Sequence, residues 1–188
     1  MSSRSLNALV LGCAVLLAGC DRESAAPAQP AATAQSVTGL DRSHKGSELP
    51  EFVLSDPAGK QLRLSSLKGQ PLLINLWATW CAPCVAELPT LDALAERQTG
   101  KLKVLTISQD GPKKDAVAAF LKQRGVKHLE PWLDPELELM SHYQAGTLPM
   151  TVLYDVQGRE VWRMTGPREW GDAESTKLVA EALGGQNR

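Results

Sequence analysis

The chain has 188 residues, a formal net charge of −1, 43% hydrophobic residues and four cysteines. Its near-neutral charge and scattered basic residues argue against an electrostatic surface for nucleic acid, so no nucleic-acid partner is expected. This length suits one domain of ordinary size accompanied by shorter segments.

The first twenty residues have the pattern of an export signal. Arg4 supplies a positive charge, and residues 6–18 carry no charge and are apolar apart from Asn7. This run is shorter than the ~20 apolar residues that a bilayer-spanning helix needs, and it suits the core of a signal peptide. The sequence therefore predicts an exported protein.

The end of the apolar run, Leu17-Ala18-Gly19-Cys20, resembles the lipobox of bacterial lipoproteins. The resemblance implies a lipoprotein signal peptide over residues 1–19 and a lipid on Cys20 that anchors the mature chain to the bacterial membrane, facing the periplasm. Asp21 resembles the signal that retains lipoproteins in the inner membrane of enteric bacteria. An ordinary secretory signal that contains a cysteine is the alternative.

Residues 20–48 are expected to form a flexible tether. They are rich in Ala, Pro, Gln, Ser and Thr and poor in large apolar residues. A segment of this composition buries too little apolar surface to offset the entropy lost on ordering. Residues 49–188 then form the folded domain.

The predicted elements of this domain alternate between strands and helices. Residues 52–54 and 62–64 flank the turn signal Asp56-Pro57-Ala58-Gly59 and predict a hairpin, and the apolar run 72–77 predicts a strand covered on both faces. Further on, the patterns predict a helix over 82–98, a strand over 103–108, a helix over 116–124, a strand near 131–133, a helix opened by Asp134, a hairpin of 150–154 with 160–165, and a helix over 172–183. This order indicates an α/β fold, a mixed central sheet flanked by helices.

Cys81 and Cys84 form a C-x-x-C pair between the strand at 72–77 and the following helix. Because Cys13 lies in the signal peptide and Cys20 is expected to carry a lipid, this pair holds the only cysteines free for chemistry in the mature chain. A lone pair in this setting indicates a redox dithiol rather than half of a zinc site.

The start of a helix favours a cysteine thiolate, because unpaired backbone N–H groups and the helix dipole stabilise negative charge there. We expect this position to lower the pKa of Cys81 from ~8.5 into the range ~3.5–7.5, and we expect Cys81 to be exposed and to attack disulfides. Cys84 shares the apolar face of the helix with Leu88 and Leu91, so it is expected to be shielded and to resolve the mixed disulfide. A permanent stabilising disulfide is the alternative, although so short a loop gains little chain entropy.

The stretch Trp77-Ala78-Thr79-Trp80-Cys81-Ala82-Pro83-Cys84, with Leu148-Pro149 before a later strand, resembles the thioredoxin superfamily. The extra helix and strand between 103 and 133 resemble the TlpA/ResA-like branch, which includes membrane-tethered thiol-disulfide reductases that serve cytochrome c maturation. The resemblance implies a thioredoxin-like fold with an N-terminal β-hairpin, a helix–strand insertion, a redox-active Cys81–Cys84 disulfide and no cofactor.

The same resemblance implies the partners of the reaction. Substrates would be disulfides in exported proteins, such as the oxidised C-x-x-C-H sites of apocytochromes c, and an inner-membrane thiol donor would reduce the pair again. Reductants and oxidants share this scaffold, so the motif leaves the direction of electron flow open.

Three further positions are candidates for the site. Leu148-Pro149 resembles the cis-proline loop of the superfamily, where the Leu148 backbone would bind an incoming peptide like an added strand; a trans proline that merely starts a strand is the alternative. Trp80 is expected to shield the dithiol and to border the docking surface. Glu87 resembles the glutamate of the TlpA/ResA-like branch and would accept the proton of Cys84, since Asn75 stands where thioredoxin has an aspartate; a solvated glutamate is the alternative.

Two other functions are possible for such a chain. A thiol peroxidase of the same fold would resemble peroxiredoxins, but Ala78 stands where they have a threonine and Thr79 comes one residue too late. A copper-binding chaperone would use Cys81 and Cys84, although copper-delivery relatives space their cysteines by three residues. No metal site is expected, because His44, His128 and His142 lack metal-ligand spacing.

Overall fold

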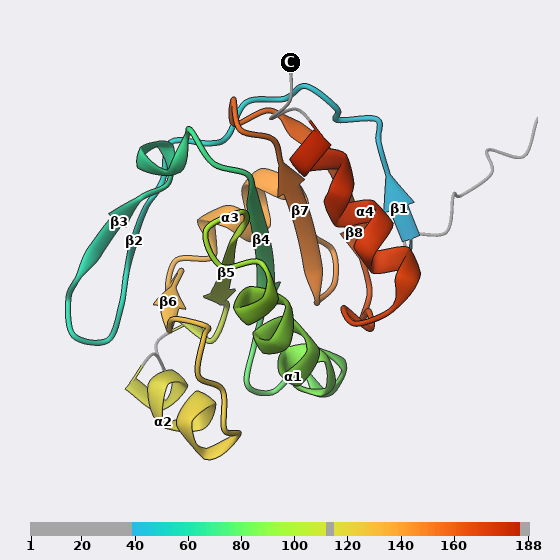
Figure 1. The fold of residues 1–188 in the computed structure, drawn as a ribbon. Coiled ribbons are helices and arrows are strands. Elements are labelled where there is room, and N and C mark those ends of the chain that lie inside the picture. Colours follow the sequence, from blue (N-terminus) through green and yellow to red (C-terminus); the bar gives the residue numbers. More distant parts are fainter. Residues whose placement is uncertain (1–38, 112–114, 185–188) are drawn as a thin grey trace, which may run out of the picture. The chain divides into compact units, whose positions relative to one another are not determined.

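The computed structural model describes residues 39–111 and 115–184. The helices and strands are β1 (Gly39–Asp41), β2 (Val53–Ser55), β3 (Gln61–Arg63), the 3-10 helix η1 (Leu64–Leu67), β4 (Leu72–Trp77), α1 (Ala82–Arg97), β5 (Lys103–Ser108), α2 (Asp115–Gln123), β6 (Trp132–Leu133), α3 (Glu138–Tyr143), β7 (Met150–Tyr154), β8 (Glu160–Thr165) and α4 (Ala173–Leu183). The strands form one mixed sheet in the order β1-β8-β7-β4-β5-β6-β2-β3 (Figure 1). The predicted α/β fold, with a mixed sheet, an N-terminal hairpin and a helix–strand insertion, is confirmed.

The centre of the sheet is β4, whose six residues are all buried. It runs parallel to β5 and antiparallel to β7, so Leu76 lies opposite Ile107 on one side and Met150 on the other. Helices α1 and α4 cover one face of the sheet and α3 covers the other (Figure 1). A strand buried between two layers of helices reads as a continuous apolar run, which is why the pattern at 72–77 predicts it well.

The edge of the sheet beside β8 differs from the prediction. Residues 39–48 were expected to belong to the tether, but Gly39–Asp41 forms β1, which pairs antiparallel with β8. The backbone beyond β1 is held to the same strand, because Gly46 N donates to Glu160 O at 2.8 Å and Glu160 N donates to Ser47 O at 2.8 Å. The prediction of a flexible segment is therefore wrong for residues 39–48, where the unpaired edge of β8 supplies hydrogen-bond partners that composition cannot reveal. Residues 1–38, with the predicted signal peptide, Cys20 and Asp21, lie outside the described residues.

The helix expected to open at Asp134 begins later. Residues after Asp134 form a turn, and α3 starts at Glu138. The N-cap residue of α3 is Leu137, so both the predicted N-cap and the predicted helix start are wrong. The Asp134 carboxylate still reaches across the turn and accepts from Glu138 N at 3.0 Å and from Leu139 N at 2.9 Å.

The predicted insertion is present as α2 and β6, between β5 and α3. Phe120 of α2 lies near Trp77, with ring centroids 6.0 Å apart, which places this helix against the end of β4. Within residues 39–111 and 115–184, none of the helices combines the length and apolar character needed to cross a membrane.

Candidate active site

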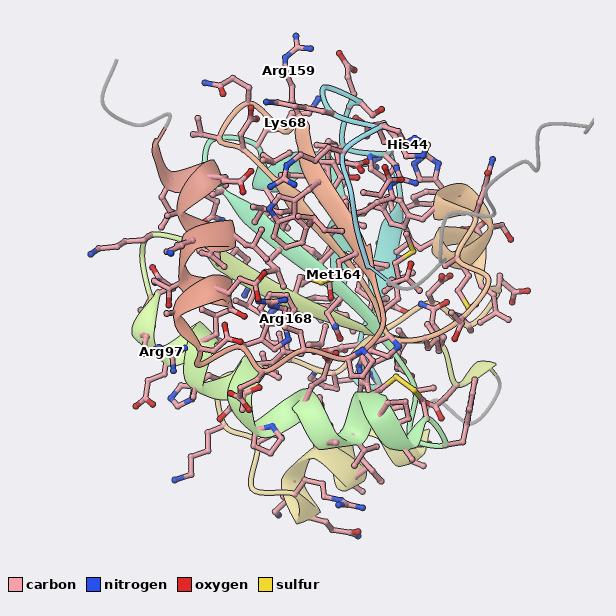
Figure 2. The ribbon with its side chains drawn as sticks, turned by 90° about the vertical axis from the view of Figure 1, so that its right-hand side faces the viewer. His44, Lys68, Arg97, Arg159, Met164 and Arg168 are labelled. Carbon is pink, nitrogen blue, oxygen red and sulfur yellow. A yellow bond between two sulfur atoms is a disulfide. The ribbon has the colours of Figure 1, made fainter. Side chains whose placement is uncertain are left out.

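Cys81 and Cys84 form a disulfide at the start of α1, with the two Sγ atoms 2.06 Å and the two Cα atoms 5.3 Å apart (Figure 2). The helix begins directly after β4 and a four-residue turn, in which Cys81 N donates to Ala78 O at 3.2 Å. Pro83 lies in the first helical turn, where its missing N–H leaves no carbonyl unpaired. The C-x-x-C pair therefore sits where the sequence places it.

Cys81 is the N-cap residue of α1. Its backbone is extended, with φ −88° and ψ 97°, and its Sγ accepts a hydrogen bond from Cys84 N at 3.3 Å. The first turn of α1 contains no acidic residue. The N–H of Cys84 and the positive end of the helix dipole thus face the sulfur of residue 81, and both stabilise a thiolate there once the disulfide is reduced.

The two sulfurs differ in burial, though less than predicted. Cys84 is 0% exposed, which confirms that it is shielded, and Cys81 is 6% exposed, so the expectation of a well exposed Cys81 is wrong for the oxidised state. Trp80, by contrast, is 69% exposed beside the pair and forms an apolar projection at the rim of the site.

The Leu148–Pro149 peptide bond is cis, which confirms the predicted isomer. Met150, the residue after Pro149, pairs with Leu76 near the end of β4. Leu148 and Pro149 therefore lie next to the turn that leads to Cys81. Pro149 O accepts from Gly166 N at 2.9 Å, so the loop after β8 is held to the same edge. The structure thus brings the Leu148-Pro149 loop and the C-x-x-C turn to one end of the sheet.

Glu87 is 4% exposed, on the same buried face of α1 as Cys84. Its Oε1 accepts from Asn75 Nδ2 at 2.7 Å and its Oε2 accepts from Arg168 N at 2.9 Å. Burial raises the pKa of Glu87 to about 7, because desolvation of the carboxylate outweighs the stabilising hydrogen bonds from Arg168 N and Asn75. A solvent-exposed glutamate is therefore excluded here.

Asn75 connects the sheet to α1. Its Nδ2 donates to Glu87 and also to Thr151 Oγ1, at 3.1 Å, while its buried Oδ1 has no hydrogen-bond partner among the described residues. Because Asn75 is a neutral amide, Glu87 is the titratable side chain of this hydrogen-bonded pair. The sequence pointed to both residues, but their contact depends on how α1 packs on β4.

The loop after β8 completes the surroundings of Glu87, and the sequence contained no signal for it. Arg168, which is labelled in Figure 2, contributes its backbone N–H. Its guanidinium donates to Ser175 Oγ at 2.6 Å and lies 2.8 Å from the Glu174 carboxylate. A hollow of about 420 Å³ lies between this loop and α1, lined by Pro83, Ala86, Glu87, Pro167, Arg168 and Glu169. Glu87 thus borders a space that is open to solvent.

Thr79, in the turn before Cys81, is bound to another residue that the sequence did not single out. Its hydroxyl and its backbone N–H both donate to the carboxylate of Asp110, which follows β5. This hydroxyl is therefore engaged with Asp110.

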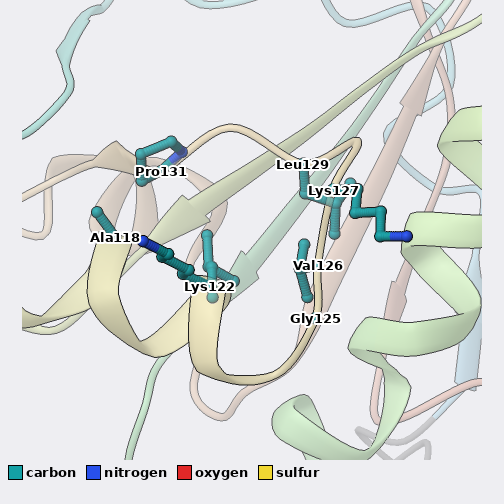
Figure 3. A pocket seen from close by; sticks show the side chains of 8 residues that line it. Ala118, Lys122, Gly125, Val126, Lys127, Leu129 and Pro131 are labelled. Carbon is teal, nitrogen blue, oxygen red and sulfur yellow. The ribbon is translucent and has the colours of Figure 1, made fainter.

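A separate hollow of about 320 Å³ lies between α2 and the segment that leads to β6 (Figure 3). None of its lining residues belongs to the C-x-x-C turn, the Leu148-Pro149 loop or the loop after β8. Within the described part of the chain, no group of three or more His, Cys, Asp or Glu side chains is placed to hold a metal ion.

Comparisons with known proteins agree with this geometry. The family model described as Redoxin matches residues 44–180. The thiol-disulfide oxidoreductase ResA of Bacillus subtilis is 34% identical over 128 residues, which are 68% of this chain and 71% of that protein.

Two solved structures are also similar. An exposed lipoprotein thioredoxin, Etrx1 from Streptococcus pneumoniae, is 28% identical with a TM-score of 0.60, covering 70% of this chain and 99% of that one. A thiol:disulfide interchange protein described as DsbE from Chlorobium tepidum shares the fold, with a TM-score of 0.65 at 24% identity over 74% of this chain and 97% of that one. The chain therefore belongs to the Redoxin family and is a thiol-disulfide oxidoreductase of the ResA type.

Proposed function

We propose that this protein is a membrane-anchored reductase of disulfides in exported proteins, with oxidised C-x-x-C-H sites of apocytochromes c among its substrates. The observation that carries the mechanism is the carboxyl of Glu87, which is buried on α1 one helical turn after Cys84. Similarity to ResA and to an exposed lipoprotein thioredoxin supports the cellular setting.

The reaction is a two-step exchange. The Cys81 thiolate attacks one sulfur of the substrate disulfide, forms a mixed disulfide and releases the other substrate sulfur as a thiolate. Cys84 then loses its proton and attacks Cys81 Sγ, which expels the second substrate sulfur. The substrate gains two electrons and two protons, and the protein is left with the Cys81–Cys84 disulfide.

Glu87 supplies the proton acceptor that the second step needs. Because burial raises the pKa of Glu87 to about 7, the carboxylate and the acid are both populated at neutral pH, which suits a group that takes a proton and returns it. The hollow beside Arg168 and Glu169 gives that proton a route to solvent. If Glu87→Gln left the Cys84 thiol pKa and the exchange rate unchanged, this role would be excluded.

Substrate docking is assigned to Trp80 and Leu148. Trp80 offers an exposed apolar surface beside Cys81. Within the described residues, the Leu148 N–H and C=O make no backbone hydrogen bond, and the C=O receives only a long contact from Thr147 Oγ1 at 3.4 Å. These backbone groups support a role in pairing with the backbone of an extended substrate.

The membrane anchor rests on the lipobox-like sequence before Cys20, with Asp21 favouring the inner membrane. An inner-membrane thiol donor would then re-reduce the pair. Cys20→Ser is expected to release the processed protein from the membrane fraction. A processed Cys20→Ser protein that stays membrane-bound through a lipid would overturn the anchor.

The direction of electron flow is tested by the equilibrium of the dithiol with glutathione. A reductase is expected to have a potential nearer ~−270 mV, and an oxidant one near ~−120 mV. In parallel, the reduced protein should transfer its electrons to a synthetic peptide that carries an oxidised C-x-x-C-H sequence. A potential near that of the oxidants would reverse the proposed direction while leaving the oxidoreductase activity in place.

A further inference from the structure

The carboxylate of Asp110 accepts hydrogen bonds from three donors at the edge of the active site. Asp110 is buried, and its Oδ2 accepts from Thr79 N at 3.0 Å and from Ser108 Oγ at 2.6 Å. Its Oδ1 accepts from the Thr79 hydroxyl. Two of these three donors belong to one residue of the turn that precedes Cys81.

The position of Asp110 follows from the parallel pairing of β4 and β5. Trp77 pairs with Ser108, and Gln109 N donates to Trp77 O at 2.8 Å, so the chain leaves both strands at the same level. Asp110 then stands beside the turn that runs from Ala78 to Cys81. A charged acceptor at this point holds the turn more firmly than a neutral one, because hydrogen bonds to a carboxylate are stronger.

We propose that Asp110 is a positioning residue of the thiol-disulfide exchange, which acts through Thr79 to hold the turn that presents Cys81 at the N-terminus of α1. The Sγ of Cys81 gains its stabilising contact from Cys84 N only at the observed place, 3.3 Å away. A turn that is free to shift moves the sulfur away from that N–H and from the helix axis. The thiolate of residue 81 is then less stabilised, and fewer of its encounters with a substrate disulfide are productive.

The test compares variants that weaken the hydrogen bonds between Thr79 and Asp110 with variants that leave them in place. Thr79→Val removes the hydroxyl donor and changes no charge, whereas Thr79→Ser keeps the donor and serves as the conservative rescue. Asp110→Asn turns one acceptor oxygen into an NH2 group that faces donors. Asp134→Asn is the matched control, because Asp134 is also a buried carboxylate that accepts two backbone N–H bonds, at the start of α3.

Two readouts are measured on each reduced full-length protein: the pKa of Cys81 from the pH dependence of its alkylation, and the rate of insulin disulfide reduction. Thr79→Val and Asp110→Asn are expected to raise the Cys81 pKa and to slow the reduction by about tenfold, with the larger loss in Asp110→Asn. Removing a negative charge alone would lower that pKa, so a rise in Asp110→Asn reports lost positioning. Thr79→Ser should match the wild type.

The proposal is overturned if Thr79→Val alters neither the Cys81 pKa nor the rate by more than twofold. It is equally overturned if Thr79→Val and Asp134→Asn change both readouts alike, since that would reveal a general loss of stability. The decision does not depend on Asp110→Asn, so a failure of that variant to fold leaves the test intact.

Discussion

Two buried glutamates in this domain have opposite surroundings. Glu160, at the start of β8, is 2% exposed, and its two carboxylate oxygens accept from Arg163 Nε and from the second guanidinium nitrogen, Nη2, each at 2.7 Å. Glu87, on α1, is 4% exposed and is held by an amide and a backbone N–H, and within residues 39–111 and 115–184 no positive side chain is bonded to its carboxylate.

The difference separates a carboxylate that stabilises the fold, Glu160, from one that can take part in proton transfer, Glu87. The guanidinium of Arg163 compensates the charge of Glu160 and ties β8 to α3 through Tyr143 O at 3.2 Å. Neutral donors compensate Glu87 only in part, so its pKa rises to about 7 and its proton remains exchangeable near neutral pH. A buried carboxylate can thus exchange a proton near neutral pH where its hydrogen-bond donors are neutral groups and not a positively charged side chain.

The largest effects are expected from the sulfurs themselves. Cys81→Ser should reduce the exchange rate by about 10³-fold or more, because it removes the nucleophile. Cys84→Ser should block turnover equally but accumulate a mixed disulfide on Cys81, detectable by mass spectrometry of the intact protein. A mixed disulfide on Cys84 in the Cys81→Ser protein would reverse the assignment of the two roles.

Removing Arg163, the partner of Glu160, should destabilise the folded protein. Arg163→Met leaves the Glu160 charge buried and unpaired, which is expected to lower the free energy of unfolding by about 3–5 kcal/mol. Urea unfolding measures this loss, and the double variant Glu160→Met/Arg163→Met should recover much of it. Under conditions where Arg163→Met is folded, its exchange rate should equal that of the wild type; a slowed reaction would mean that the two regions are coupled.

The raised pKa of Glu87 should instead be detectable in the pH dependence of the free energy of unfolding. Because burial raises the pKa of Glu87 from 4.5 to about 7, the folded state holds this proton more tightly than the unfolded state does. The stability it confers is present in full below pH 4.5 and is lost as the pH rises through 7. Relative to Glu87→Gln, the wild type should lose about 3 kcal/mol of unfolding free energy between pH 4 and pH 8. Parallel pH dependences of the two proteins would contradict the raised pKa.

The smallest effect is expected at the rim. Trp80 is 69% exposed, so Trp80→Ala should change the free energy of unfolding by less than about 0.5 kcal/mol. If its ring borders the docked substrate, the same change should weaken substrate binding by ~1 kcal/mol, roughly fivefold in KM. Val53→Ala is the control, since Val53 is an exposed apolar side chain on β2. Equal KM values for the two variants would remove Trp80 from the docking surface.

Much of this fold could be predicted because its signals are local. The apolar runs of β4 and β5 mark both strands at their observed ends, and the C-x-x-C pair marks the start of α1. By contrast, β1 is a short strand of three residues whose pairing partner, β8, lies more than a hundred residues further along the chain. Its sequence has no pattern that distinguishes it from a tether.

The site divides in the same way. Cys81, Cys84 and the cis bond before Pro149 follow from motifs, and Glu87 stands at a fixed spacing from Cys84. The contacts that give Glu87 its pKa come from Asn75 and from the Arg168 backbone, which only the packed sheet and helices bring together. A backbone N–H carries no sequence signal, and a lone aspartate such as Asp110 carries one too weak to notice.

The attack on a substrate disulfide depends on the acidity of one sulfur, Cys81 Sγ. The measurement is the rate of alkylation of Cys81 in the reduced Cys84→Ser protein as a function of pH, which reports the fraction of thiolate at residue 81. We predict a midpoint below pH ~7.5, because the N-cap position of Cys81 places its Sγ against Cys84 N and the positive end of α1. A midpoint at or above pH ~8.5, the value of an unperturbed thiol, would contradict the account.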